Sequence, residues 1–161
     1  MSSKYAVVIK QGIALPEREI LVRRAWGDVP ASYIQDQEVF NECRFLDLKV
    51  NKWVVNKQWS NQQNSEPWIR VEMLKGGALK EYLRNESCSL SLDVTDEALV
   101  ILELDEGGLE LDEVLLLSLV SAFHSGYKIY RWVDGFQEVG EDIFISLPTQ
   151  HAIRERLLTC A

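Results

Sequence analysis

No lysine or arginine occurs in the 43 residues from Asn85 to Tyr127. The same stretch holds ten acidic residues, so its formal charge is −10, whereas the whole chain carries −8. The 84 residues before it carry a formal charge of +3, and the 34 residues after it carry −1. The acidity is therefore local, and a local field of one sign can steer a partner of the opposite sign.

Cysteine and long apolar runs are also scarce. The three cysteines, Cys43, Cys88 and Cys160, are odd in number and widely spaced, which fits neither a disulfide framework nor a zinc site. The longest apolar segment, 114–123, contains two serines and falls short of the ~20 residues that span a bilayer. The N-terminal apolar run, 6–9, is too short for a signal peptide. We therefore expect a cytoplasmic protein that does not enter a membrane.

Sequence motifs that name a reaction are missing. The chain has no HExxH, no phosphate-binding glycine loop, no nucleophile elbow and no calcium loop. Lysine and arginine do not cluster along the sequence, and the pI is near 4.8, which argues against nucleic acids and anionic membranes as partners. We expect no catalytic residue, no metal and no cofactor.

What is present fits one ordinary domain. We interpret residues 1–161 as a single globular domain, because a chain of this length buries roughly 68–70% of its unfolded surface. Its 47% hydrophobic and 26% charged residues are typical of a folded protein.

Apolar patterns predict several strands. They cover 5–10, 68–74, 90–94, 99–102 and 127–133, and alternation over 45–59 predicts one long strand with Trp53 and Trp59 on the same face. Asp134 and Gly135 are a strong hairpin signal. Either 136–139 or 143–147 would pair with the strand that precedes this turn.

Helices are predicted over 78–84, 110–124 and 149–160, the last with Thr149 as its N-cap. The segment 110–124 opens with three acids, which complement the helix dipole, and is then apolar nearly all round. We expect it to be the buried central helix. The segment 16–26 is compatible with a helix or a strand. Together these elements indicate an α+β fold, with a mainly antiparallel sheet and helices packed on one face.

The charge pattern suggests a function. We interpret the chain as a non-enzymatic acidic module that neutralises or escorts a basic protein partner, such as an immunity protein that inhibits a toxin. The likeness to immunity proteins lies in charge and size only. A secretion chaperone is an alternative of the same class, and a homodimer is compatible with the sequence. A small enzyme or ligand-binding domain with carboxylates lining a cleft is the alternative of a different class.

Candidate partner-binding residues come from the acidic stretch and from one aromatic pair. Tyr130 and Trp132 share a predicted strand face with Lys128, although core packing is the alternative for both rings. The full set of candidates is Glu103, Asp105, Glu106, Glu110, Asp112, Glu113, Tyr130 and Trp132.

Overall fold

The computed structural model describes residues 3–10, 12, 16–35, 45–85, 90, 92–123 and 128–160. Its strands are β1 (Lys4–Lys10), β2 (Ala31–Gln35), β3 (Phe45–Val50), β4 (Ile69–Leu74), β5 (Glu97–Leu104), β6 (Lys128–Trp132) and β7 (Phe136–Val139). Its helices are α1 (Arg18–Trp26), α2 (Lys52–Val55), η2 (Lys57–Asn61), α3 (Gly76–Asn85), α4 (Glu110–Phe123), η3 (Glu141–Phe144) and α5 (Gln150–Thr159).

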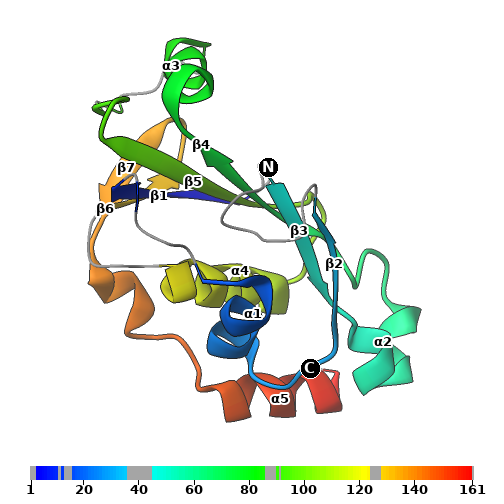
Figure 1. Ribbon diagram of the computed structural model, residues 1–161. Helices are drawn as coiled ribbons and strands as arrows, with labels where there is room; N and C mark the ends of the chain where they lie inside the picture. The colour runs from blue at the N-terminus through cyan, green and yellow to red at the C-terminus, as the bar shows by residue number, and fades with distance from the viewer. Residues whose placement is uncertain are drawn as a thin grey trace.

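The seven strands form one sheet in the order β2-β3-β4-β5-β1-β6-β7, and every neighbouring pair is antiparallel. The predicted antiparallel α+β fold is thereby confirmed. Figure 1 shows α1, α4 and α5 below the sheet, with α5 outermost, and α3 above it. The main helical layer therefore lies on one face, and α3 covers part of the other.

Strand β5 holds the middle of the sheet because it is apolar on both faces. Val100 and Leu102 point into the large core under the helical layer, while Leu99 and Ile101 point into a smaller core under α3. A strand buried on both faces is expected to read as a continuous apolar run. The predicted central strand over 99–102 is confirmed.

The ambiguous segment 16–26 is a helix. Leu21 and Ala25, one helical turn apart, are both buried and place one face of α1 against α4. The Trp26 indole Nε1 donates to the Leu115 carbonyl of α4 at 2.9 Å. Helix α1 ends at Gly27, whose φ of +73° is favourable only for glycine.

The prediction of one strand over 45–59 is wrong beyond residue 50. Strand β3 ends at Val50, and the chain continues through α2 and η2. The apolar positions are even through Val50 and odd from Trp53 onward, so the alternation changes phase where the strand ends. The shared face for Trp53 and Trp59 is wrong too, because Trp53 is 50% exposed and Trp59 is buried in the large core.

Other predicted elements had mixed outcomes. The hairpin is confirmed, with Trp132 opposite Phe136, and so is the Thr149 N-cap, whose Oγ1 accepts from the Ala152 N–H at 3.1 Å. Neither 90–94 nor 143–147 forms a strand where the structure describes them, although Leu90 is buried in the smaller core. Helix α4 is confirmed through Phe123. Residue 124, the predicted end of this helix, and residue 127, the predicted start of the next strand, lie outside the described part of the chain, as do the cysteines at 43 and 88. No described helix is both long and apolar enough to cross a bilayer.

Candidate functional site

The fold supplies the acidic stretch with counter-charges from distant parts of the chain. Lys10 of β1 pairs with Asp96 at 2.7 Å, and Lys52 of α2 pairs with Asp112 of α4. A segment that lacks basic residues in its sequence is therefore partly neutralised in three dimensions. The negative electrostatic field of this stretch is therefore weaker than a count of its ten acids suggests.

Glu103 belongs to a row of alternating charges across the outer sheet face. The register places Arg70 of β4 and Lys4 of β1 opposite Glu103 on its two sides, with Asp47 of β3 opposite Arg70. Arg70 donates to both Asp47 carboxylate oxygens at 2.8 Å, and this hydrogen bonding raises the pKa of Arg70. Cross-strand pairs of opposite charge stabilise a sheet. The position of Glu103 between two basic residues therefore suits it to stabilise the sheet.

Asp112 must be corrected as a surface candidate, because it is only 2% exposed. Its Oδ1 lies 2.5 Å from Lys52 Nζ, and its Oδ2 accepts from the Leu109 N–H at 2.8 Å, which caps the first turn of α4. Burial raises the pKa of Asp112, and Lys52 opposes that rise. Asp112 therefore has a structural role inside the protein, and it could contact a partner only if the surrounding residues unfolded.

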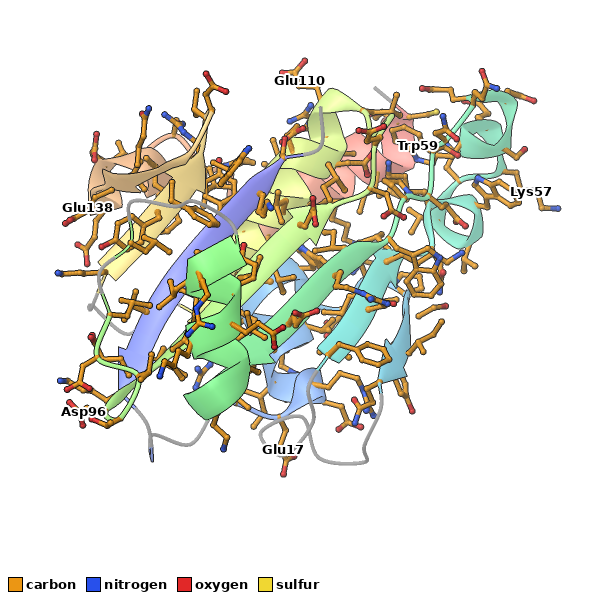
Figure 2. The ribbon with its side chains drawn as sticks, turned by 90° about the horizontal axis from the view of Figure 1, so that it is seen from above. Glu17, Lys57, Trp59, Asp96, Glu110 and Glu138 are labelled. Atoms are coloured by element: carbon orange, nitrogen blue, oxygen red, sulfur yellow. The ribbon has the colours of Figure 1, made fainter. Side chains whose placement is uncertain are left out.

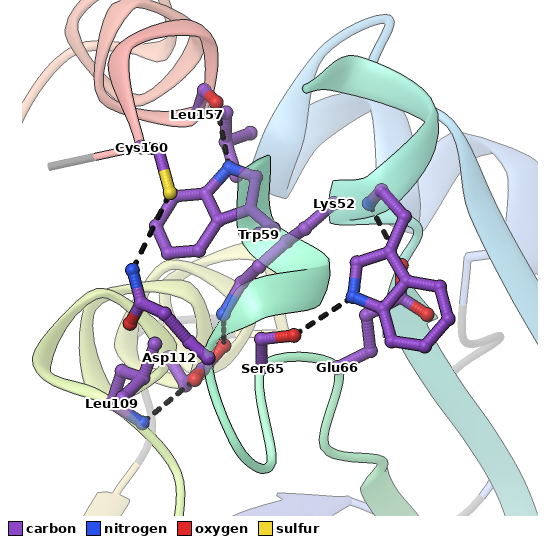
Figure 3. Close-up of polar contacts among 10 residues, drawn as sticks. Lys52, Trp59, Ser65, Glu66, Leu109, Asp112, Leu157 and Cys160 are labelled. Carbon is purple, nitrogen blue, oxygen red and sulfur yellow. Dashed lines mark hydrogen bonds and ion pairs between the residues drawn. The ribbon is translucent and has the colours of Figure 1, made fainter. Parts of the chain in front are cut away.

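Lys52 and its neighbours attach the segment formed by α2 and η2 to the helical layer (Figure 3). Lys52 is fully buried, and its Nζ lies 4.9 Å from the centroid of the Trp59 ring. Its contact with Asp112 has the distance of an ion pair but not the angles of a hydrogen bond. Trp59 Nε1 in turn donates to the Leu157 carbonyl of α5 at 2.7 Å. Lys52 was not identified as a buried residue from the sequence, because it falls within the predicted strand and because its partner Asp112 is distant in sequence.

Four of the candidate acids remain exposed. Asp105 and Glu106 lie in the β5–α4 connection, and Glu110 and Glu113 lie in the first turn of α4. We call Asp105, Glu106, Glu110 and Glu113 the acidic end; none of them forms an ion pair with another described residue. Figure 2 shows Glu110 at the end of the molecule opposite Glu17.

The backbone of this connection is well fixed. The Asp105 N–H donates to the Trp68 carbonyl at 3.0 Å, and Ser3 Oγ donates to Glu113 Oε1 at 2.5 Å. Gly107 has a φ of +86°, and a Cβ there would meet the Asn64 amide at 2.9 Å. The four like charges therefore lie on a connection and a first helical turn that both have a defined conformation.

Tyr130 and Trp132 are half-buried and pack against the smaller core. The Trp132 ring lies edge-on to Phe136 with 5.0 Å between centroids, and Lys4 Nζ lies 4.7 Å from the Trp132 centroid. These contacts match the core-packing alternative for both rings. Lys4, which contacts the Trp132 ring, lies opposite Glu103 near the end of β5.

Two adjoining cavities were not foreseen from the sequence. The first, about 320 Å³, lies between α1 and β2 and is lined by Arg18, Val22 and Tyr33 among others. The second, about 350 Å³, lies between α1 and α5 and is lined by Arg23, His151, Arg154 and their neighbours.

Within the described ranges, no group of three or more histidine, cysteine, aspartate or glutamate side chains is arranged to hold a metal ion. No family model, curated protein or solved structure matches this chain.

Proposed function

We propose that this protein is a non-enzymatic module that binds a basic protein partner through the acidic end. The observation that carries the proposal is that Asp105, Glu106, Glu110 and Glu113 are exposed and form no ion pair with another described residue, while Asp96 and Asp112 are paired. These four acids fall within nine consecutive residues, which cover the β5–α4 connection and the first turn of α4. Neutralising a toxin, as an immunity protein does, is the specific activity that this module would perform.

Electrostatic physics favours a binding role over simple solvation. Acids in the first turn of α4 gain from the helix dipole, each about 0.3–1 kcal/mol. Four like charges close together repel one another, and a surface that serves solubility alone usually mixes both signs. A basic partner would relieve that repulsion and would also be steered toward the surface before contact.

The proposal is tested by comparing two variants of equal net charge. One neutralises the acidic end, with Asp105→Asn, Glu106→Gln, Glu110→Gln and Glu113→Gln. The control neutralises four exposed acids elsewhere, with Glu81→Gln, Glu138→Gln, Asp142→Asn and Glu155→Gln. Figure 2 shows Glu138 well apart from Glu110.

Wild type and both variants are used as baits on protein from cells that carry the neighbouring genes, and the captured proteins are quantified. We expect basic proteins that wild type and the control variant retain, and that the acidic-end variant loses. Equal capture by all three baits, or equal loss by both variants, would contradict binding at the acidic end.

A further inference from the structure

The two cavities adjoin each other along α1, and we call the pair the α1 depression. Arg23, Gly27, Asp28 and Val29 line both of them. One cavity reaches from this shared wall to the edge strand β2, and the other reaches to α5. Each has a volume at the low end of the ~300–1,000 Å³ range of small-molecule sites.

Basic side chains gather here although acids outnumber bases in the chain, 25 to 17. Arg18 and Arg23 line the first cavity, and Arg23, His151 and Arg154 line the second. Neither Arg23 nor Arg154 forms an ion pair with another described residue. Two carboxylates also line the depression, against three guanidinium groups, so its formal charge is positive.

Glu19 and Asp28 are the acids of this depression, Glu19 in the first cavity and Asp28 in both. The Glu19 carboxylate lies 3.9 Å from Arg18 and is 80% exposed, so it neutralises Arg18 only weakly. Arg18 is held mainly by neutral groups. Its guanidinium lies 3.4 Å from the Tyr33 ring centroid, and its Nη1 donates to Gln35 Oε1 at 2.6 Å. Such contacts fix the side chain without cancelling its charge.

The lining of the first cavity is mostly polar but includes an apolar part. Val22, Val29 and Leu48 line it, together with the Tyr33 ring, which is about half exposed. Guanidinium groups suit phosphate because they can donate two parallel hydrogen bonds to its oxygens. We propose that this depression binds a small phosphate ester with a flat apolar group. The apolar group would lie against Val22 and Tyr33, and the phosphate would lie between Arg23 and Arg154.

This site is separate from the acidic end, because it is built from α1, β2 and α5 and not from the β5–α4 connection. A failure of either proposal leaves the other standing. The acidic-end variant described above is expected to bind phosphate esters as wild type does.

The test is a titration followed by ¹H–¹⁵N spectra, with phenyl phosphate as the probe. Inorganic phosphate tests the anion alone, phenol tests the ring alone, and sodium chloride at matched ionic strength tests screening. We expect phenyl phosphate to give saturable shifts at Gly27, Asp28 and Val29 and to bind more tightly than inorganic phosphate or phenol. An absence of saturable shifts beyond those of sodium chloride would overturn the proposal.

Two pairs of substitutions on the same helices locate the site. Arg23→Gln with Arg154→Gln removes the two guanidinium groups that line the second cavity, and we expect affinity to fall by about tenfold or more. Arg24→Gln with Arg156→Gln makes the same change in charge at positions that line neither cavity, and we expect a change below about twofold. Equal losses in both variants would show a diffuse field and would overturn the site.

Asp28→Asn provides a test in the opposite direction. It removes the carboxylate that faces both cavities, so phenyl phosphate should bind more tightly than it does to wild type. A gain of affinity could not come from damage to the fold. Unchanged or weaker binding to this variant would contradict the proposed position of the phosphate.

Discussion

Lys52 Nζ and Asp112 Oδ1 lie 2.5 Å apart, and both residues are buried, with 0% and 2% of their surface exposed. This ion pair joins α2, which interrupts the region predicted as a strand, to the first turn of α4. Because both charges are removed from water, each depends on the other for compensation.

Removing one member of the pair should destabilise the protein far more than removing both. We expect Lys52→Met or Asp112→Asn alone to lower the free energy of unfolding by about 3–5 kcal/mol, since either leaves a buried group without its partner. The double variant should regain most of this loss, because asparagine can still accept from the Leu109 N–H. Urea unfolding of all four proteins measures the coupling, and simple additivity of the two losses would contradict it.

The Lys52→Met variant should also lose stability as the pH rises. Burial already raises the pKa of Asp112, and loss of Lys52 removes the influence that opposes this rise. A folded-state pKa above the unfolded value of ~3.9 means that the folded state binds more protons between the two values. Stability from this group is therefore full at low pH and falls as the pH rises through the raised pKa.

Urea unfolding of Lys52→Met at several pH values between about 4 and 8 checks this dependence. Lys52→Met with Asp112→Asn is the control, because it has no carboxylate at position 112 and should lose the added pH dependence. A Lys52→Met variant with the same pH profile as this control would show that the pKa of Asp112 is not raised in the folded variant, and it would contradict the prediction.

Two neighbouring leucines of α4 should differ strongly in their contribution to stability. Leu116 is fully buried, whereas Leu117 is only partly buried against the large core. Leu116→Ala should cost about 2–5 kcal/mol, the usual cost of a cavity in a packed core, and Leu117→Ala should cost clearly less. Thermal unfolding of the two variants measures the difference, and equal costs would mean that α4 is rotated from the orientation described.

Local patterns were enough to predict the central parts of the fold. The continuous apolar run of β5, the acids and leucines of α4, and the Asp134-Gly135 turn each encode their structure within a few residues. The prediction of one strand over 45–59 was wrong in its second half, because the structure there depends on a contact with a residue distant in sequence. Lys52 is buried only because Asp112, 60 residues later, accompanies it.

The candidate site was predictable only in part for the same reason. A charge count along the chain finds ten acids together, but not that Lys10 lies beside Asp96 or that Arg70 and Lys4 lie opposite Glu103. Nor does sequence spacing show that arginines from α1 and α5 line one depression. Asp105, Glu106, Glu110 and Glu113 were predicted as exposed acids because turns and helix starts keep short acidic segments in water.

The acidic end should be dispensable for folding. Its four substitutions remove the dipole contribution of Glu110 and Glu113 but also relieve repulsion among like charges, so the free energy of unfolding should change by less than about 1–2 kcal/mol. Circular dichroism during heating checks this. A large loss of stability would instead show that these acids support the fold, and it would weaken their assignment to partner binding.

The association rate of the captured basic partner, measured across a salt series, tests the acidic end most directly. Long-range charge acts mainly on encounter, so wild type should associate fast at about 0.05 M salt and more slowly at about 0.5 M, where the Debye length is shorter. The acidic-end variant should associate slowly at both, and the control variant should follow wild type. Association that is indifferent to salt and to the four substitutions would contradict electrostatic binding at this surface.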